Sequence, residues 1–128
     1  MTRRFILIGA IFGFIGVAIG AFGAHGLADT LESNGRADTF QTASEYQMYH
    51  ALAILAVAWL STKVDHNLVQ RVGYFFVAGI LIFSGSLYVL AIFDLGFMGA
   101  IAPIGGASLL AGWASVGWIG WRHMSDEN

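Results

Sequence analysis

Four apolar runs, each close to the length of a membrane-spanning helix, constrain this chain more than any other feature. They cover approximately residues 5–27, 43–62, 68–93 and 97–121 of the 128 residues. About 20 helical residues are needed to cross the roughly 30 Å of hydrocarbon in a bilayer. The second run reaches this length only when its polar start is included, whereas the other three reach it without help. The first run is longer than the core of a signal peptide, which is about 7–15 residues, so we expect it to be retained.

The composition agrees with a chain that is surrounded by lipid. Hydrophobic residues make up 57% of the sequence and charged residues 11%, whereas a soluble domain carries about 25% charged residues. Inside a bilayer the backbone must satisfy its own hydrogen bonds, and long apolar runs do so as helices. We therefore predict an all-α, integral membrane four-helix bundle, formed by residues 1–128 as a single four-span domain.

The charge and the missing cysteines exclude several classes of function. The formal net charge is −2, so no basic field attracts nucleic acid. The chain has no cysteine, which excludes disulfides, thiolate metal sites and a cysteine nucleophile.

The distribution of lysine and arginine predicts the orientation in the membrane. If the N-terminus is cytoplasmic, five of the six basic residues lie on the cytoplasmic side, and these are Arg3, Arg4, Lys63, Arg71 and Arg122. Arg36 is then the one basic residue on the opposite side. Cytoplasmic loops are enriched in lysine and arginine. We expect both termini to be cytoplasmic and the protein to be a multi-pass protein of the bacterial inner membrane.

The links between the apolar runs are short, except for residues 28–41. Within this link, residues 29–33 can form one or two helical turns that end at Asn34 and Gly35. Asp38 is a candidate N-cap for the second long helix, and the Thr42-to-Glu45 spacing fits a capping box. Residues 94–96 predict a tight reversal between the last two runs.

Glycines form a stripe along the first run. Five of them fall within an arc of roughly 80° when they are placed on a helix, and these are Gly9, Gly13, Gly16, Gly20 and Gly23. Lipid gives helices no hydrophobic reason to associate, so close backbone contact matters in a membrane. We interpret the stripe as a helix-packing surface, and a glycine-lined channel is the alternative. Pro103 in the fourth run is expected either to kink its helix or to lie in the first turns.

Two polar segments flank the link between the first and second runs. Residues 20–26 read Gly-Ala-Phe-Gly-Ala-His-Gly, and residues 45–52 read Glu-Tyr-Gln-Met-Tyr-His-Ala-Leu. With these two motifs and its four-span layout, the chain resembles the domain-of-unknown-function family four-two-three, the YgdD/YwdK-like small bacterial membrane proteins with a mitochondrial relative in animals. The resemblance covers essentially the whole chain. It implies a small membrane protein and no established activity.

These segments hold the candidate site, which is a polar cluster at the non-cytoplasmic surface of the membrane. Its residues are His25, Glu45, Tyr46, Tyr49 and His50. Two imidazoles and a carboxylate suggest a metal site, and two histidines on different helices suggest a haem. However, Glu45 and His50 are five positions apart, or about 140° around a helix. We predict no metal and no cofactor, and we expect these side chains to hydrogen-bond across helix ends and to loop amides.

The sequence favours a structural or accessory role that works through helix contacts, either by self-association or within a larger membrane complex. Mid-helix charges, which ion pumps and proton relays use, are absent from the sequence. A transport component is one alternative, and lipid, quinone, haem or metal binding at the polar cluster is another. No serine elbow or zinc-protease motif is present, so we do not expect an enzyme.

Overall fold

The computed structural model describes residues 1–65 and 67–126 of the chain. Helices and short connections account for this whole part, which holds no strand. The predicted all-α class is confirmed.

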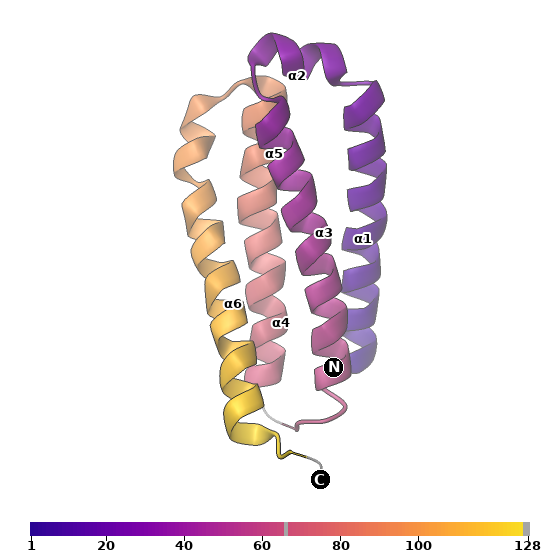
Figure 1. The fold of residues 1–128 in the computed structure, drawn as a ribbon, viewed down its shortest axis with the longest axis vertical. Helices are drawn as coiled ribbons and strands as arrows, with labels where there is room; N and C mark the ends of the chain where they lie inside the picture. Colours follow the sequence, from indigo (N-terminus) through magenta and orange to yellow (C-terminus); the bar gives the residue numbers. More distant parts are fainter. Residues whose placement is uncertain (66, 127–128) are drawn as a thin grey trace.

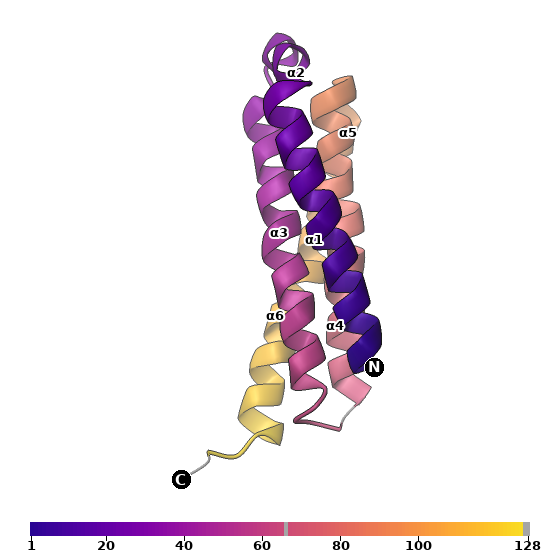
Figure 2. The ribbon, with the colours of Figure 1, turned by 90° about the vertical axis from the view of Figure 1, so that its right-hand side faces the viewer.

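Four long helical segments lie side by side (Figures 1 and 2). They are α1 (Thr2–His25), α3 (Ala37–Leu60), α6 (Ala102–His123) and a composite segment built from α4 (Asn67–Gly79), a π-helical turn η1 (Ile80–Ser84) and α5 (Gly85–Phe93). The start of α1 and the end of α6 lie at the same end of the molecule, as Figure 1 shows. We call this the terminal end and the opposite one the α2 end.

Three segments are long and apolar enough to cross a membrane: Thr2–His25, Asn67–Phe93 and Gly96–His123. The helix α3 is not one of them, although it has 24 residues. Its last ten residues are apolar, but its first 14 residues carry Asp38, Gln41, Glu45, Gln47 and His50. The second predicted run, 43–62, therefore corresponds to a helix that is polar at one end and apolar at the other.

The short helix α2 (Ala28–Asn34) lies across the ends of the long helices (Figure 1). It stops where Gly35 adopts a left-handed conformation with φ 64°, which glycine tolerates best. The Asn34 amide donates to the carbonyls of Ala91 at 3.0 Å and Ile92 at 3.1 Å. These carbonyls lie in the last turn of α5, where the helix leaves them without a partner of its own. Arg36 pairs with Asp94 at 3.4 Å, so two contacts tie α2 and its C-terminal connection to the end of α5.

The predicted cap of the second long helix is wrong. The helix α3 begins at Ala37 with Arg36 as its N-cap, and no side chain caps it. Helical geometry resumes at Ala37, after the single residue Arg36, so Asp38 already lies in the first turn, where its carboxylate faces the positive end of the helix dipole. Glu45 lies within the helix and accepts a hydrogen bond from the Gln41 amide at 2.9 Å, so it forms no capping box.

The last two long segments pack closely near the π-helical turn. A 3₁₀ helix η2 (Gly96–Ala100) precedes α6, and Pro103 lies in the first turn of α6, where its missing amide hydrogen costs little. A Cβ added at Gly105 would lie 2.3 Å from the backbone nitrogen of Phe83 in the π-helical turn. The backbone of α6 therefore touches the backbone of η1, and only glycine fits at this point.

Candidate functional site

The glycine stripe of α1 faces α3. A Cβ at Gly9 would meet Leu55 at 2.8 Å, one at Gly16 would meet Met48 at 2.7 Å, and one at Gly23 would meet the Phe40 ring at 2.1 Å. Gly20 lies against Ser44 in the same way, at 3.2 Å. The two helices thus approach closely along almost the full length of α1, because this side of α1 carries no side chains.

Gly13 is the exception within this stripe, because a Cβ there would have no neighbour within 4 Å. Gly13 lies at one edge of the glycine arc, about 80° from Gly23 at the other edge. The contact surface therefore uses one side of the arc. Pro103, the other predicted packing residue, is exposed and lines a groove between α3 and α6.

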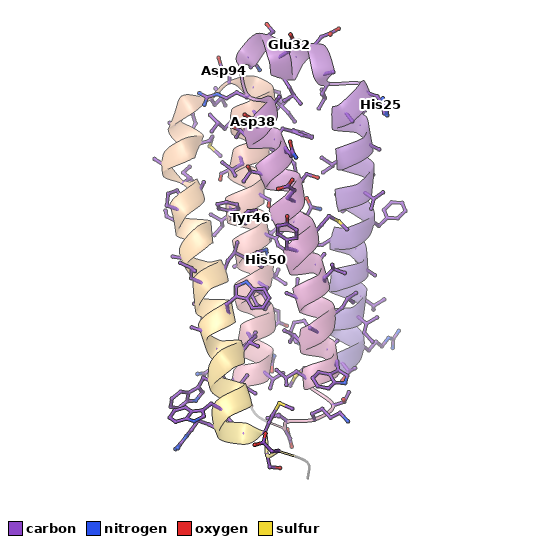
Figure 3. The ribbon with its side chains drawn as sticks, viewed as in Figure 1. His25, Glu32, Asp38, Tyr46, His50 and Asp94 are labelled. Atoms are coloured by element: carbon purple, nitrogen blue, oxygen red, sulfur yellow. The ribbon has the colours of Figure 1, made fainter. Side chains whose placement is uncertain are left out.

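The predicted polar cluster is only partly assembled. The Tyr46 ring lies 5.8 Å from the Tyr49 ring and 6.0 Å from the His50 ring, measured between centroids, whereas Glu45 is bonded to Gln41. His25 lies exposed at the end of α1, and Glu45 and Tyr49 are exposed on α3. His50 is buried, with 5% of its surface exposed, and Figure 3 shows it much farther from the α2 end than His25. No group of three or more histidine and acidic side chains in residues 1–65 and 67–126 is arranged to hold a metal ion.

The start of α3 explains why the cluster is dispersed. The sequence predicts a membrane-spanning segment from residue 43, which would put His50 near the membrane surface. The helix instead begins at Ala37, so His50 lies 13 residues, or about 20 Å, along it. His25 and His50 therefore differ in depth and lack a common ligand.

His50 joins α3 to α6. Its Nδ1 lies 2.7 Å from the Tyr46 carbonyl oxygen, and its Nε2 lies 3.0 Å from the Trp113 indole nitrogen. An indole nitrogen can only donate, so Nε2 is the acceptor and Nδ1 carries the proton that is donated to Tyr46. Both ring nitrogens are occupied, and neither is available to ligate a haem or metal.

Aromatic rings surround this histidine. The His50 ring is 5.6 Å from Phe76 and 5.9 Å from Trp113, and the Tyr46 ring is 4.9 Å from Phe83, measured between ring centroids. A groove of about 450 Å³ runs along this surface between α3 and α6. Its walls include Tyr46, His50, Phe83, Pro103, Gly106 and Trp113.

A second polar network, which the sequence interpretation missed, joins α3 to α1 and to the segment of η1 and α5. The Gln47 amide donates to the Phe12 carbonyl of α1 at 2.9 Å and accepts from the Tyr88 hydroxyl of α5 at 2.7 Å. Ser84 donates to the Ala43 carbonyl at 2.8 Å. One glutamine therefore connects three helices.

Helical periodicity could have identified Gln47. Ala43, Gln47, His50 and Ile54 are all buried, and their spacing of four, three and four places them on one face of a helix. A polar residue within a buried face must find partners. The partners themselves could not be identified, because Tyr88 is 41 residues away in the sequence and Trp113 is 63 residues from His50.

Comparison with known proteins gives the family. The family described as "Protein of unknown function (DUF423)" matches residues 19–106, which include both polar motifs. The chain belongs to this family. Among its relatives, the UPF0382 inner membrane protein YgdD of Escherichia coli (strain K12) is 45% identical over 89% of this chain and 87% of its own length.

Two further relatives extend the similarity. The UPF0382 membrane protein YwdK of Bacillus subtilis (strain 168) is 39% identical over 89% of this chain and 93% of its own length. A UPF0382 membrane protein of Haemophilus influenzae (strain ATCC 51907 / DSM 11121 / KW20 / Rd) is 40% identical over 98% of this chain and 99% of its own. No solved structure matches the chain.

These findings confirm the resemblance to this family and the prediction of a small membrane protein. The protein is a small multi-pass membrane protein of the bacterial inner membrane, in contact with lipid, from a family without an assigned activity.

Proposed function

We propose that this protein is a structural or accessory component of the bacterial inner membrane that works through helix contacts. In this proposal it crosses the bilayer four times as a helical bundle, with both termini in the cytoplasm. It either associates with further copies of itself or serves as a subunit of a larger membrane complex, and it catalyses no reaction.

The hydrogen bonds made by the buried polar side chains are the main support for this proposal. Within residues 1–65 and 67–126, every buried side-chain nitrogen and oxygen has a hydrogen-bond partner. Gln47, His50 and Ser84 are bonded to other helices. A transport path or active site needs polar groups that are free to meet a solute. Here those groups hold the helices together instead.

The outer face of α1 supports a role in contacts within the membrane. Phe14 is 77% exposed, and Ile11 and Val17 are also exposed. Because α1 packs on α3 along its glycine side, its bulky side remains available to lipid or to another protein helix.

Two observations support four crossings with cytoplasmic termini. The 24 residues of α3 give a length of about 36 Å, enough to cross the hydrocarbon, and its buried polar groups are satisfied inside the protein. The termini lie at the same end in Figure 1, together with five of the six basic residues, and basic residues favour the cytoplasmic side.

Native mass spectrometry of the full-length protein in a mild detergent tests the role. We expect a mass that corresponds to several copies, or to one copy with a stoichiometric protein partner. The same preparation is reconstituted in liposomes and assayed for solute flux. A monomer without a partner, together with a specific and saturable flux, would replace this proposal with transport.

The groove between α3 and α6 favours one second candidate function, which is the binding of a largely apolar molecule such as a lipid chain or a quinone. Its volume of about 450 Å³ and its aromatic walls suit such a ligand, whereas metal or haem ligation would require breaking the bonds of His50. A stoichiometric small molecule that is retained by wild type and lost from Gly106→Leu would support this candidate. Equal retention of the small molecule by both proteins would exclude the groove as its binding site.

A further inference from the structure

The starts of α1 and α4 each carry an arginine at the terminal end, Arg4 on α1 and Arg71 on α4. Arg4 lies in the first turn of α1, and its Nη1 donates to the Tyr74 hydroxyl at 2.7 Å. Arg71 and Tyr74 are three positions apart on α4, so their side chains lie on the same face of that helix. The Tyr74 hydroxyl thus connects the guanidinium of Arg4 to the surface that carries Arg71.

The packing of Phe5 against α4 fixes the position of the first turn of α1. Phe5 is fully buried, and its ring occupies the space beside Gly73, where a Cβ would lie 2.2 Å from the ring. The rings of Phe5 and Tyr74 meet edge to face at 5.6 Å. The N-terminal turn of α1 is therefore anchored on α4, and Arg4 is held at Tyr74, on the helix face that carries Arg71.

The charge of these arginines is not neutralised by the protein. Neither α1 nor α4 has an acidic residue in its first turn. Among residues 1–65 and 67–126, Arg36 and Asp94 form the one ion pair between an arginine or lysine and a carboxylate. Asp65, in the connection before α4, is exposed and pairs with neither Arg4 nor Arg71. The positive ends of two helix dipoles add to the same field.

Tryptophan residues indicate the level of Arg4 and Arg71 relative to the membrane surface. Trp59, Trp118 and Trp121 lie at the same end as the two termini, on the last turns of α3 and α6. Lys63 lies over the Trp59 ring at 6.0 Å, and Arg122 over both other tryptophan rings at 5.6 Å. Tryptophan and basic residues gather at the level of lipid headgroups, which is the depth of phospholipid phosphates when α1 and α4 enter the bilayer at this end.

We propose that Arg4, Arg71 and Tyr74 form a binding site for the phosphate of an anionic phospholipid. Guanidinium groups match phosphate oxygens through paired N–H donors. The Tyr74 hydroxyl accepts from Arg4 and therefore keeps its own O–H to donate to a phosphate oxygen. The inference depends on α1 and α4 entering the bilayer at this end, and it goes beyond the accessory role proposed above.

The test is a native mass spectrometry titration of the full-length protein in a neutral detergent. Phosphatidylglycerol and phosphatidylcholine with the same acyl chains are compared. We expect wild type to prefer phosphatidylglycerol. The double variant Arg4→Ala/Arg71→Ala should lose about fivefold in affinity for each arginine removed, or about 25-fold in total.

Arg122→Ala is the matched control, because it removes a positive charge at the same end but on α6, where Arg122 is stacked on tryptophan. We expect it to change phosphatidylglycerol affinity by less than about twofold, since exposed charges are screened by salt and Arg122 is engaged with the Trp118 and Trp121 rings rather than with Tyr74. An equal loss per charge in this control would show a diffuse field and overturn the site.

Two further arms keep the proposal falsifiable. Equal binding of the two lipids to wild type overturns it without any variant, so the test survives if the double alanine variant does not fold. Displacement of phosphatidylglycerol by millimolar inorganic phosphate would show a site for free anions rather than lipid. Arg4→Lys/Arg71→Lys, which keeps the charge, should retain the lipid preference with a weaker affinity because the paired donors are lost.

Discussion

His50 lies between a carbonyl and an indole, and these two neighbours decide its chemistry. The Tyr46 carbonyl accepts the proton on Nδ1, and the Trp113 indole donates to Nε2. The ring is thereby fixed as the neutral tautomer and links α3 to α6. A residue type that often binds metal serves here as a hydrogen-bonded connector.

Trp113→Phe tests this connection. The substitution keeps an aromatic ring but removes the indole N–H, so Nε2 of a buried histidine loses its donor. We expect the protein to lose about 1 kcal/mol of stability. Reversible unfolding in mixed detergent micelles measures the stability, and nitrogen NMR should report a changed environment at Nε2.

The control for this variant is Trp118→Phe. Trp118 is exposed on the same helix and has no part in the His50 contact, so its replacement should change stability by less than about 0.5 kcal/mol. Equal losses in the two variants would show that the His50 bond contributes no more than a surface contact.

At the same scale, the sequence identified His50 and Tyr46 as notable but could not identify what they bind. Their importance followed from polar residue types near a membrane span. Trp113, Gln47 and Tyr88 escaped notice because tryptophan, glutamine and tyrosine are unremarkable until the fold brings them to a partner. His25 was included because it ends the first apolar run and His50 lies near the start of the second, whereas α3 begins at Ala37 and places His50 about 20 Å along the helix.

The helices pair through glycines in two different ways. In α1 a row of glycines faces the side chains of α3, whereas in α6 the single Gly105 meets the backbone of the π-helical turn η1. Side chains can shift to admit a methyl group, but a helix backbone cannot shift without moving the whole segment. Gly105 is therefore the more sensitive position.

Gly105→Ala should destabilise the protein, and Gly117→Ala on the same helix should not. A Cβ at Gly105 would lie 2.3 Å from the Phe83 nitrogen, whereas one at Gly117 would have no neighbour within 4 Å. We expect a loss of about 1–3 kcal/mol for the first variant and a gain of up to about 1 kcal/mol for the second. Thermal unfolding in detergent, followed by circular dichroism, compares them. If Gly105→Ala is as stable as wild type, the close contact of α6 with η1 is wrong.

Apolar length predicted the positions of the long helices well, because length and hydropathy are properties of the local sequence. The short helix before Gly35 and the early position of Pro103 in its helix followed from turn chemistry. The π-helical turn and the 3₁₀ start before α6 could not be predicted, because they depend on how α6 fits against its neighbour. The missing cap of α3 has another origin, because α3 begins at Ala37, directly after the short connection of Gly35 and Arg36.

For the whole molecule, the arrangement of the ends leads to a prediction about membrane topology. The chain has no native cysteine, so single cysteines can be introduced without background. We expect Ser33→Cys in α2 to react with a membrane-impermeant maleimide in intact cells. Thr62→Cys, after α3, and Ser125→Cys, after α6, should react only when the membrane is opened. Measured labelling of each variant before and after permeabilisation gives the result.

The outcome for Thr62→Cys decides whether α3 crosses. If Ser33→Cys and Thr62→Cys are both labelled from outside, α3 does not cross the bilayer and the four-span arrangement fails. If only Ser125→Cys departs from expectation, the last helix is the one placed wrongly.

The contacts of Asn34 and Arg36 have a consequence for biogenesis. Their partners Ala91, Ile92 and Asp94 lie 57 or 58 residues later in the chain. A ribosome that has just released α2 has not yet made the residues that hold it. The first pair of long helices is therefore made before these bonds can form, and the bonds form only after the end of α5 has been translated.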